Sequence, residues 1–321
     1  MKDPKGFQNL SGLEEPMKLL ITGSSGLLGL NLALEAMNAH EVIGVDRATL
    51  KSAPFRTIQA DLLDEGAVDS VLDEARPDWL VHCAAIADLE ACEENPEAAR
   101  RLNTDLPSAL AKACRERSIQ MVQVSTDAVF DGTKSGIYTE EDDPLPVSVY
   151  SSTKLEAERL VLESNPDAIV ARVNFYGWSL GGRRSLAEFF FNNLTNNKSM
   201  SGYTDVIFCP MHAAHLSQTL LMMLAKGLHG LYHAVGPQPM SKYQFGVEIA
   251  RKFGLNESEI SPKSIQASSL LARRAHNLYL SVNKLSTDLG QSLPSFSTGL
   301  DLFYAQFKEG FPQKLKSFTQ G

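Results

Sequence analysis

The sequence predicts an α/β fold organised around a doubly wound parallel sheet. Short apolar runs rich in β-branched residues alternate with helix-favouring stretches through the first half of the chain. A glycine-rich turn follows the first apolar run and opens the first helical stretch. Both observations are typical of a Rossmann-type domain, in which helices cover both faces of the sheet.

Strands and helices alternate up to residue 175, which we take as the end of the nucleotide-binding domain that begins at residue 17. The predicted strands cover residues 18–22, 41–45, 57–59, 79–82, 121–124 and 168–173. The predicted helices cover residues 27–37, 65–75, 96–117 and 148–163. Pro107 interrupts the third helix, so we expect that helix to be bent or divided into two pieces.

The pattern loosens after residue 175 and loses its parallel-sheet character. Helices are expected over residues 186–196, 216–226 and 241–253, with Ser241 as an N-cap. We expect residues 176–321 to form mainly a smaller substrate-binding lobe, with some chain returning to the nucleotide-binding domain. Residues 1–16 contain no apolar run, and we interpret them as a flexible leader.

Composition excludes several classes of function. The chain has 321 residues, 43% of them hydrophobic, and a formal charge of −8, with no basic run of the kind that nucleic acids require. No stretch approaches the roughly 18 consecutive apolar residues of a membrane span. The four cysteines are irregularly spaced, which favours neither disulfides nor zinc. A reducing, cytoplasmic setting fits best, with a small molecule as the partner.

The glycine-rich turn predicts a dinucleotide site. Gly23, Gly26 and Gly29 lie where phosphate oxygens can meet N–H groups at the positive end of a helix. Asp46 ends the second strand about 20 residues later, where a carboxylate can accept a hydrogen bond from a ribose hydroxyl. That carboxylate favours NAD(H), while the neighbouring Arg47 leaves NADP(H) open. Asp61 and Leu62 follow the third strand and could cap the adenine, although Asp61 is also a plausible helix N-terminal acid.

Catalytic candidates follow the fifth strand and open the fourth predicted helix. Thr126 and Asp127 lie at the carboxyl end of the strand, the edge where doubly wound sheets bind ligands. Tyr150 and Lys154 are four residues apart, so they share one helix face. We expect the cation of Lys154 to lower the pKa of Tyr150 from about 10 and make it a proton donor near neutrality. Thr126 would hydrogen-bond the reacting oxygen.

These motifs together resemble the extended short-chain dehydrogenases/reductases, and among them the dTDP-4-dehydrorhamnose reductases and related nucleotide-sugar reductases. The resemblance covers the chain from about residue 17. The stretches that carry it are Leu20-Ile-Thr-Gly23, Pro77-Asp78, His82-Cys-Ala-Ala85, Ser125-Thr-Asp127, Val129-Phe-Asp-Gly132, Val149-Tyr-Ser-Ser-Thr-Lys154, Gly230-Leu-Tyr-His233, Gly236 and Ser241-x-Tyr243. Departures are His82-Cys83 where such reductases have an asparagine, an epimerase-like segment at residues 172–177, and Cys209-Pro-Met-His212.

The resemblance implies Thr126, Tyr150 and Lys154 as the catalytic set. It implies cofactor contacts from Gly23, Ser25, Gly26, Leu27, Leu28, Gly29, Asp46, Arg47, Asp61, Leu62, Cys83, Ala84, Ala85 and Asn103, besides Tyr150 and Lys154. Substrate contacts are expected from Asp127, Asn174, Arg183 and Arg273. Arg183 with Arg184 could clamp a diphosphate, or could be a solvated charge pair. His212 and His215 lack a third ligand, so no metal is expected.

Three functions stay open at this point. The leading hypothesis is an oxidoreductase that uses NAD(P)H to reduce a nucleotide-linked 4-keto-6-deoxy sugar. The second is an epimerase or dehydratase that retains its NAD, because Asp127 lies beside the catalytic threonine, as an acid does in dehydratases. The third is a non-catalytic, dinucleotide-binding regulatory subunit. A homodimer is the default expectation for this fold.

Overall fold

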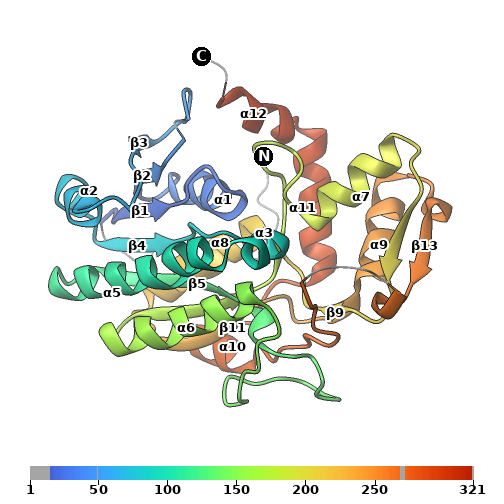
Figure 1. Cartoon of the computed structure of the whole chain (residues 1–321). Coiled ribbons are helices and arrows are strands. Elements are labelled where there is room, and N and C mark those ends of the chain that lie inside the picture. Colours follow the sequence, from blue (N-terminus) through green and yellow to red (C-terminus); the bar gives the residue numbers. More distant parts are fainter. Residues whose placement is uncertain (1–14, 49, 268–271, 320–321) are drawn as a thin grey trace.

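The computed structural model describes residues 15–48, 50–267 and 272–319 (Figure 1). All but the last two residues of the expected leader, 1–16, lie outside the described residues. A parallel sheet of seven strands forms the centre of the described chain, with the order β11-β6-β5-β4-β1-β2-β3. Its strands are β1 (Lys18–Thr22), β2 (Glu41–Asp46), β3 (Arg56–Gln59), β4 (Trp79–His82), β5 (Gln120–Thr126), β6 (Ile169–Val173) and β11 (Gly230–Ala234). The predicted fold class is confirmed.

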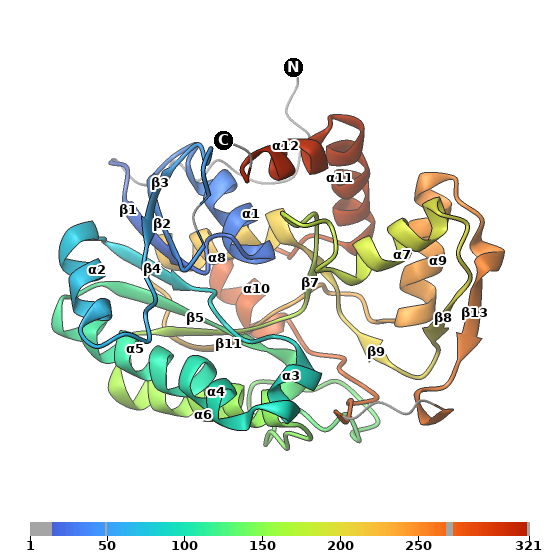
Figure 2. The same ribbon diagram turned by 45° about the horizontal axis from the view of Figure 1, so that its top comes forward.

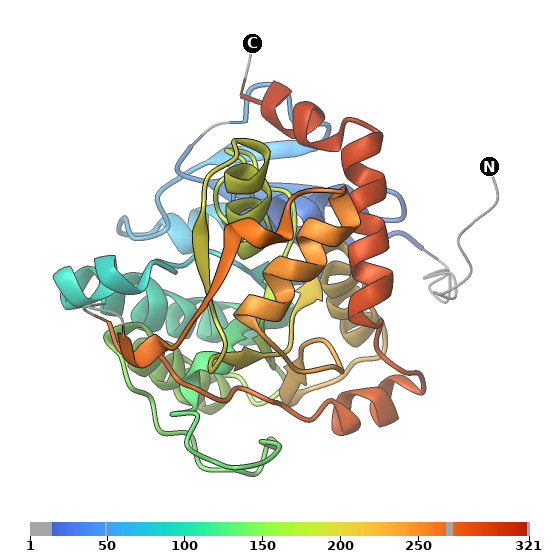
Figure 3. The same cartoon turned by 90° about the vertical axis from the view of Figure 1, so that its right-hand side faces the viewer.

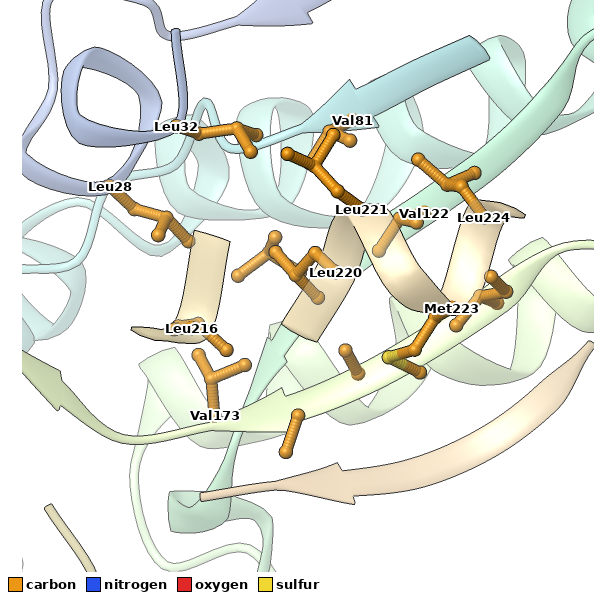
Figure 4. Close-up of a cluster of buried hydrophobic side chains, with 14 of the residues drawn as sticks. Leu28, Leu32, Val81, Val122, Val173, Leu216, Leu220, Leu221, Met223 and Leu224 are labelled. Carbon is orange, nitrogen blue, oxygen red and sulfur yellow. The ribbon is translucent and has the colours of Figure 1, made fainter. Parts of the chain in front are cut away.

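Helices cover both faces of this sheet (Figure 2). One face carries α1 (Leu27–Ala36), α8 (Ala213–Ala225) and α10 (Asn283–Leu289), and the other carries α2 (Ala67–Ala75), α5 (Leu106–Glu116) and α6 (Val149–Ser164). Because successive strand residues point to opposite faces, Ile21 packs under α1 and α8 while Leu20 packs toward α5. Figure 4 shows the first of these cores, where Leu28 of α1 and Leu220 of α8 meet Val122 of β5.

The smaller lobe lies beside the carboxyl ends of the strands and faces the viewer in Figure 3. It contains α7 (Leu186–Thr195), α9 (Lys242–Phe253), β8 (Met200–Tyr203) and β13 (Ile260–Lys263), with α11 (Phe296–Lys308) and α12 (Phe311–Ser317) alongside. Its core is aromatic: Trp178 stacks on Phe303 with ring centroids 4.0 Å apart, and Tyr176 packs edge-on against Phe245. Such pairs add to the stabilisation that area burial alone gives.

Short elements complete the described chain. They are α3 (Leu89–Glu94), α4 (Pro96–Arg100), a π-helical segment (Arg101–Asp105), β7 (Phe175–Tyr176), β9 (Ile207–Phe208), β10 (Met211–His212), β12 (Met240–Ser241), and 3-10 turns at Asp127–Val129, Glu257–Glu259 and Ile265–Ala267. No helix in the described ranges combines the length and apolar character that crossing a membrane requires. The four cysteines are free thiols.

One expectation about the backbone was wrong. The later half of the chain was expected to lose parallel-sheet character, but β11 pairs with β6 at the sheet edge and β13 pairs with β8, both in parallel. The third helix is divided as expected: a π-helical segment separates α4 from α5, and Pro107 lies in the first turn of α5. Elements after residue 175 thus belong to both parts of the molecule, and the division at that residue stays a proposal.

Candidate active site

The turn between β1 and α1 is a cradle that only glycine can form. Gly23 has φ +66°, and a Cβ added there would lie 2.8 Å from the backbone of Ala84. A Cβ on Gly29 would lie 2.3 Å from the carbonyl oxygen of Gly23. The N–H of Gly26 donates to that same oxygen at 2.9 Å, and α1 begins at the next residue. The cradle brings a helix N-terminus against open space, which fits a diphosphate.

Replacing Gly29 with Ala tests this cradle. The new methyl group must push the Gly23 carbonyl aside, so we expect a loss of roughly 1–3 kcal/mol in unfolding free energy and weaker dinucleotide binding. Gly136→Ala is the matched control, because nothing lies within 4 Å of a Cβ there. Thermal melting and calorimetric titration with NADPH measure both effects. Equal behaviour of the two variants would contradict the close approach.

A groove at the carboxyl ends of β1, β2 and β4 gathers most of the predicted cofactor residues. Its lining comprises Gly23, Ser25, Gly26, Val45, Asp46, Arg47, Ala60, Asp61, Leu62, Cys83, Ala84, Ala85, Leu102, Leu106 and Arg184. Leu27 and Leu28 are in the first turn of α1, with their side chains buried behind the groove. The groove can accept a dinucleotide. The observation that supports this fit is the glycine cradle, whose Gly23 and Gly26 line the groove.

The carboxylate of Asp46 already accepts hydrogen bonds from the β1–α1 turn. The Oδ2 atom of its carboxylate accepts from the N–H and the hydroxyl of Ser25, at 3.0 and 2.7 Å. Arg47 is largely exposed, and its guanidinium lies 4.0 Å from the carboxylate of Asp61. A ribose hydroxyl would therefore share a carboxylate that already has two donors, beside a guanidinium available to a 2′-phosphate. These contacts do not establish the predicted preference for NAD(H).

Asn103 is fully buried in the π-helical segment, away from the lining of the groove. Its side-chain oxygen accepts from the N–H of Ile86 at 2.9 Å, and its amide group donates to the carbonyl of Ile86 and to the hydroxyl of Thr153. Asn103 therefore ties the loop after β4 to α6, the helix that carries Tyr150. Its side chain positions the site, and a direct cofactor contact stays a prediction.

A second pocket lies between the carboxyl ends of the strands and the smaller lobe, and is lined by two of the three catalytic candidates, Thr126 and Tyr150, while Lys154 lines neither pocket. Its residues come from strand ends, from the start of α6 and from the lobe. They are Ala87, Leu89, Thr126, Asp127, Ala128, Val147, Ser148, Tyr150, Asn174, Val206, Phe208, Lys242, Arg273, Arg274, Ala275 and Leu278. Ser148 caps α6 with a capping box, which fixes the position of Tyr150 in its first turn.

Asp127 is the acid of this pocket. It is buried, its Oδ2 accepts from the amide of Asn174 at 2.6 Å, and the hydroxyl of Thr126 lies 3.3 Å from its Oδ1. Burial raises the pKa of Asp127 to about 6, against the lowering effects of Asn174, Thr126 and the cation of Lys242. Asp127 is therefore a hydrogen-bond acceptor that titrates near neutrality.

The expectation that Lys154 lowers the pKa of Tyr150 is wrong for this structure. Burial raises the pKa of Tyr150 to about 12; hydrogen bonding with Thr126 lowers it, and the charge of Asp127 raises it. The ammonium of Lys154 is itself buried and donates to the carbonyl of Val124 at 2.6 Å. Although Tyr150 and Lys154 share a helix face, the ammonium of Lys154 binds the carbonyl of Val124 and not the hydroxyl of Tyr150. Tyr150 is accordingly protonated at neutral pH, the form that can donate a proton.

Lys154 sits in a buried polar layer beneath α6. Burial lowers its pKa to about 8, while the carboxylate of Glu158, one helical turn away, raises it. Glu158 is in turn bound by Arg172 of β6, whose Nη2 lies 2.7 Å from Oε2, and by the hydroxyl of Ser125. Ser125 therefore faces this layer, whereas the adjacent Thr126 faces the pocket.

The pKa of Lys154 predicts an alkaline limb in the pH profile. Below about 8 the ammonium is charged, and above it the charge is lost, so any interaction that needs this cation weakens as pH rises. We expect kcat/KM for reduction to fall as pH rises through about 8. Lys154→Arg keeps its charge to much higher pH, so its residual activity should lack this limb. An unchanged limb in that variant would assign the titration to another group.

The structure adds Lys242 to the site and distinguishes the members of two arginine pairs seen in the sequence. Arg184 lines the cofactor groove, while Arg183, the predicted substrate contact, lines neither pocket; both side chains are exposed. Lys242 and Arg274 line the catalytic pocket beside Arg273, and Arg274 is bound to Glu90 at 3.1 Å. The pairs Arg183-Arg184 and Arg273-Arg274 were visible in the sequence, but spacing cannot tell which member turns inward. Little in the sequence indicated Lys242 beyond its position directly after Ser241, the predicted N-cap.

The surroundings of His212 and His215 indicate a structural role and not a metal site. The Nδ1 of His212 accepts from the N–H of Ala214 at 3.3 Å and caps α8, and burial lowers the pKa of His212 to about 3. Burial also lowers the pKa of His215, to about 4. Among the residues that the structure describes, no group of three or more His, Cys, Asp or Glu is placed to hold a metal ion.

Comparisons with known proteins agree with this geometry. Residues 17–309 match the family model described as RmlD substrate binding domain. The chain is 30% identical to the probable low-salt glycan biosynthesis reductase Agl14 of Haloferax volcanii, covering 91% of this chain and 99% of that one. It is 34% identical to methionine adenosyltransferase 2 subunit beta of Mus musculus, covering 88% and 86%. The dTDP-4-dehydrorhamnose reductase of Bacillus anthracis, solved in complex with NADP, superposes with a TM-score of 0.81 at 24% identity, covering 91% and 99%.

Proposed function

The chain belongs to the RmlD substrate binding domain family of NAD(P)-dependent oxidoreductases, and on that premise we propose that it reduces a nucleotide-linked 4-keto-6-deoxy sugar. The observation that carries the proposal is one pocket lined by Thr126, Tyr150, Asp127 and Asn174, next to the dinucleotide groove. A carbonyl carbon in this pocket would lie between a proton donor and the cofactor. The dinucleotide supplies hydride when bound.

The residues of the pocket have distinct proposed roles. Tyr150 is protonated at neutral pH and donates its proton to the oxygen of the ketone as that oxygen gains charge. Thr126 donates a second hydrogen bond to the same oxygen. The buried ammonium of Lys154, which donates to the carbonyl of Val124 in this structure, is assigned to the nicotinamide ribose. No metal is needed for charge stabilisation in this scheme.

Substrate orientation is assigned to the polar and cationic side chains around the catalytic pair. Asp127 and Asn174, joined at 2.6 Å, form a donor and acceptor pair for a sugar hydroxyl. Arg273, at the rim of the pocket, is suited to the diphosphate of a nucleotide sugar. Arg183 is exposed beyond the lining and stays a prediction as a substrate contact.

Oxidation of reduced cofactor tests the proposed reaction. Purified protein is mixed with NADH or NADPH and a panel of nucleotide-linked 4-keto-6-deoxy sugars, and the loss of the reduced nicotinamide absorbance is followed. We expect oxidation with at least one sugar. Absence of oxidation with every pair, in protein that binds both cofactors, would contradict the proposal.

A second candidate is a regulatory subunit that binds dinucleotide without turnover. It is supported by the 34% identity to methionine adenosyltransferase 2 subunit beta, whose name describes a subunit. The presence of Thr126, Tyr150 and Lys154 together favours the reductase. A third candidate, the retained-cofactor epimerase or dehydratase, draws on the acid Asp127 beside Thr126. Such a protein would purify with NAD bound and show no net oxidation.

A further inference from the structure

We propose that Arg184 binds a phosphate group of the dinucleotide, so that the smaller lobe contributes directly to the cofactor site. The inference rests on the dinucleotide part of the proposed function and is independent of the sugar. Arg184 precedes α7 of the lobe in sequence and yet lines the groove formed by the β1–α1 turn and the ends of β2 and β4. The groove thus receives one residue from a segment more than 130 positions after its glycine cradle.

The loop that carries Arg184 is built around one buried carboxylate. Glu188 is fully buried, and its oxygens accept from the backbone N–H groups of Ser179, Arg184 and Ser185 at 2.6, 2.8 and 3.1 Å. The hydroxyl of Ser179 also donates to Glu188 and accepts from the N–H of Arg183. A carboxylate that satisfies three backbone donors within seven residues fixes the path of the loop. The backbone of Arg184 is therefore held in place before any ligand arrives.

The side chain of Arg184, by contrast, is uncommitted. Within the described part of the chain its guanidinium has no hydrogen bond or ion pair, although five N–H donors are available. The carboxylate of Asp46, which lines the same groove, already accepts two hydrogen bonds from Ser25. An exposed cation on a fixed backbone, facing a groove whose other wall is a helix N-terminus, is placed to bind an anion between them. A phosphate of the dinucleotide is that anion.

Two phosphate sources have the same chemistry, namely the diphosphate bridge and a 2′-phosphate. Arg47 lines the same groove from the end of β2, so the two guanidinium groups could act together on a 2′-phosphate. The N-terminus of α1 favours the diphosphate bridge. Binding of NADPH, NADH and 2′,5′-ADP separates these sources, since NADH has only the bridge and 2′,5′-ADP has only the 2′-phosphate beyond its 5′-phosphate.

The test is calorimetric titration of Arg184→Ala with these three ligands, without sugar. We expect NADPH affinity to fall roughly 10- to 100-fold, the loss typical of a charge-assisted contact. An equal loss with NADH identifies the diphosphate; a loss confined to NADPH and 2′,5′-ADP identifies the 2′-phosphate. Arg184→Lys should retain part of the affinity. Because alanine keeps the N–H that binds Glu188, the loop should stay folded, and circular dichroism with thermal melting checks this.

Arg183→Ala is the matched control, because it makes the same charge change one residue earlier on a side chain that is equally exposed but does not line the groove. We expect its affinities to stay within roughly threefold of the unaltered protein, as for a screened surface charge. Unaltered binding of all three ligands by Arg184→Ala would overturn the inference, as would an equal loss in Arg183→Ala. Normal binding in a protein that oxidises no cofactor would overturn the reductase proposal alone.

Discussion

Replacing Tyr150 with Phe is expected to lower kcat for keto-sugar reduction by roughly 10²- to 10⁴-fold, the usual contribution of a positioned general acid. Phenylalanine keeps the ring in the pocket and removes only the hydroxyl. The pKa of about 12 means that the native hydroxyl is protonated across the neutral range, so its proton is available without prior titration. Removing it leaves Thr126 as the donor to the developing charge.

Cofactor binding separates this effect from misfolding. Tyr150→Phe should keep its affinity for NADPH within about tenfold, because a single neutral hydrogen bond is worth roughly 0.5–1.5 kcal/mol. Tyr304→Phe, which makes the same chemical change on a half-buried residue of α11, should retain full activity. Steady-state kinetics and titration of both variants provide the comparison. A Tyr150→Phe protein with near-normal kcat would remove Tyr150 from the reaction.

Replacing Glu158 with Gln is expected to cost roughly 3–5 kcal/mol of unfolding free energy, because it leaves the buried Arg172 without its counter-charge. Both side chains are nearly inaccessible, at 3% and 2% exposure, so solvent cannot replace the lost charge. Nε of Arg172 lies 3.1 Å and Nη2 lies 2.7 Å from carboxylate oxygens of Glu158. Denaturant unfolding measures the loss.

A double variant and a variant of an exposed ion pair serve as controls for the loss of stability in Glu158→Gln. The double variant Glu158→Leu with Arg172→Met removes both charges and should recover much of the stability. Glu257→Gln breaks the exposed pair with Arg251 and should produce no measurable change. Since the carboxylate of Glu158 raises the pKa of Lys154, the Glu158→Gln protein should also lose activity at a lower pH than the native protein. A single variant as stable as the native protein would contradict the buried pairing.

The sequence predicted the first half of the fold well because each signal there was local. Apolar strands, a glycine turn and helix periodicity fixed β1 to β6 to within a few residues. β11 was not predicted because Gly230 and His233 interrupt its apolar pattern, and because its place beside β6 depends on a pairing over about 60 residues. Pro107 predicted an interruption of the third helix, but the contacts that Asn103 of the π-helical segment makes with Ile86 and Thr153 are tertiary and appear in no local pattern.

For the site, spacing identified residues but not their electrostatics. Tyr150 and Lys154 were found from their four-residue separation, yet the pKa of Tyr150 depends on burial and on the engagement of Lys154 with Val124. The choice between Arg183 and Arg184 depends on the loop around Glu188 and on Gly182, whose φ is +67°. Because these are tertiary features, the sequence identified the arginine pair but could not predict which of the two lines the groove.

Deuteride transfer tests the central claim most directly. The purified protein is incubated with NADPH or NADH deuterated at the transferable position and a nucleotide-linked 4-keto-6-deoxy sugar, and the sugar product is analysed by nuclear magnetic resonance. The account predicts a deuterium at the former keto carbon, in amounts equal to the cofactor oxidised, and at least a hundredfold slower transfer with Tyr150→Phe. Cofactor that binds but never delivers deuterium to any such sugar would contradict it.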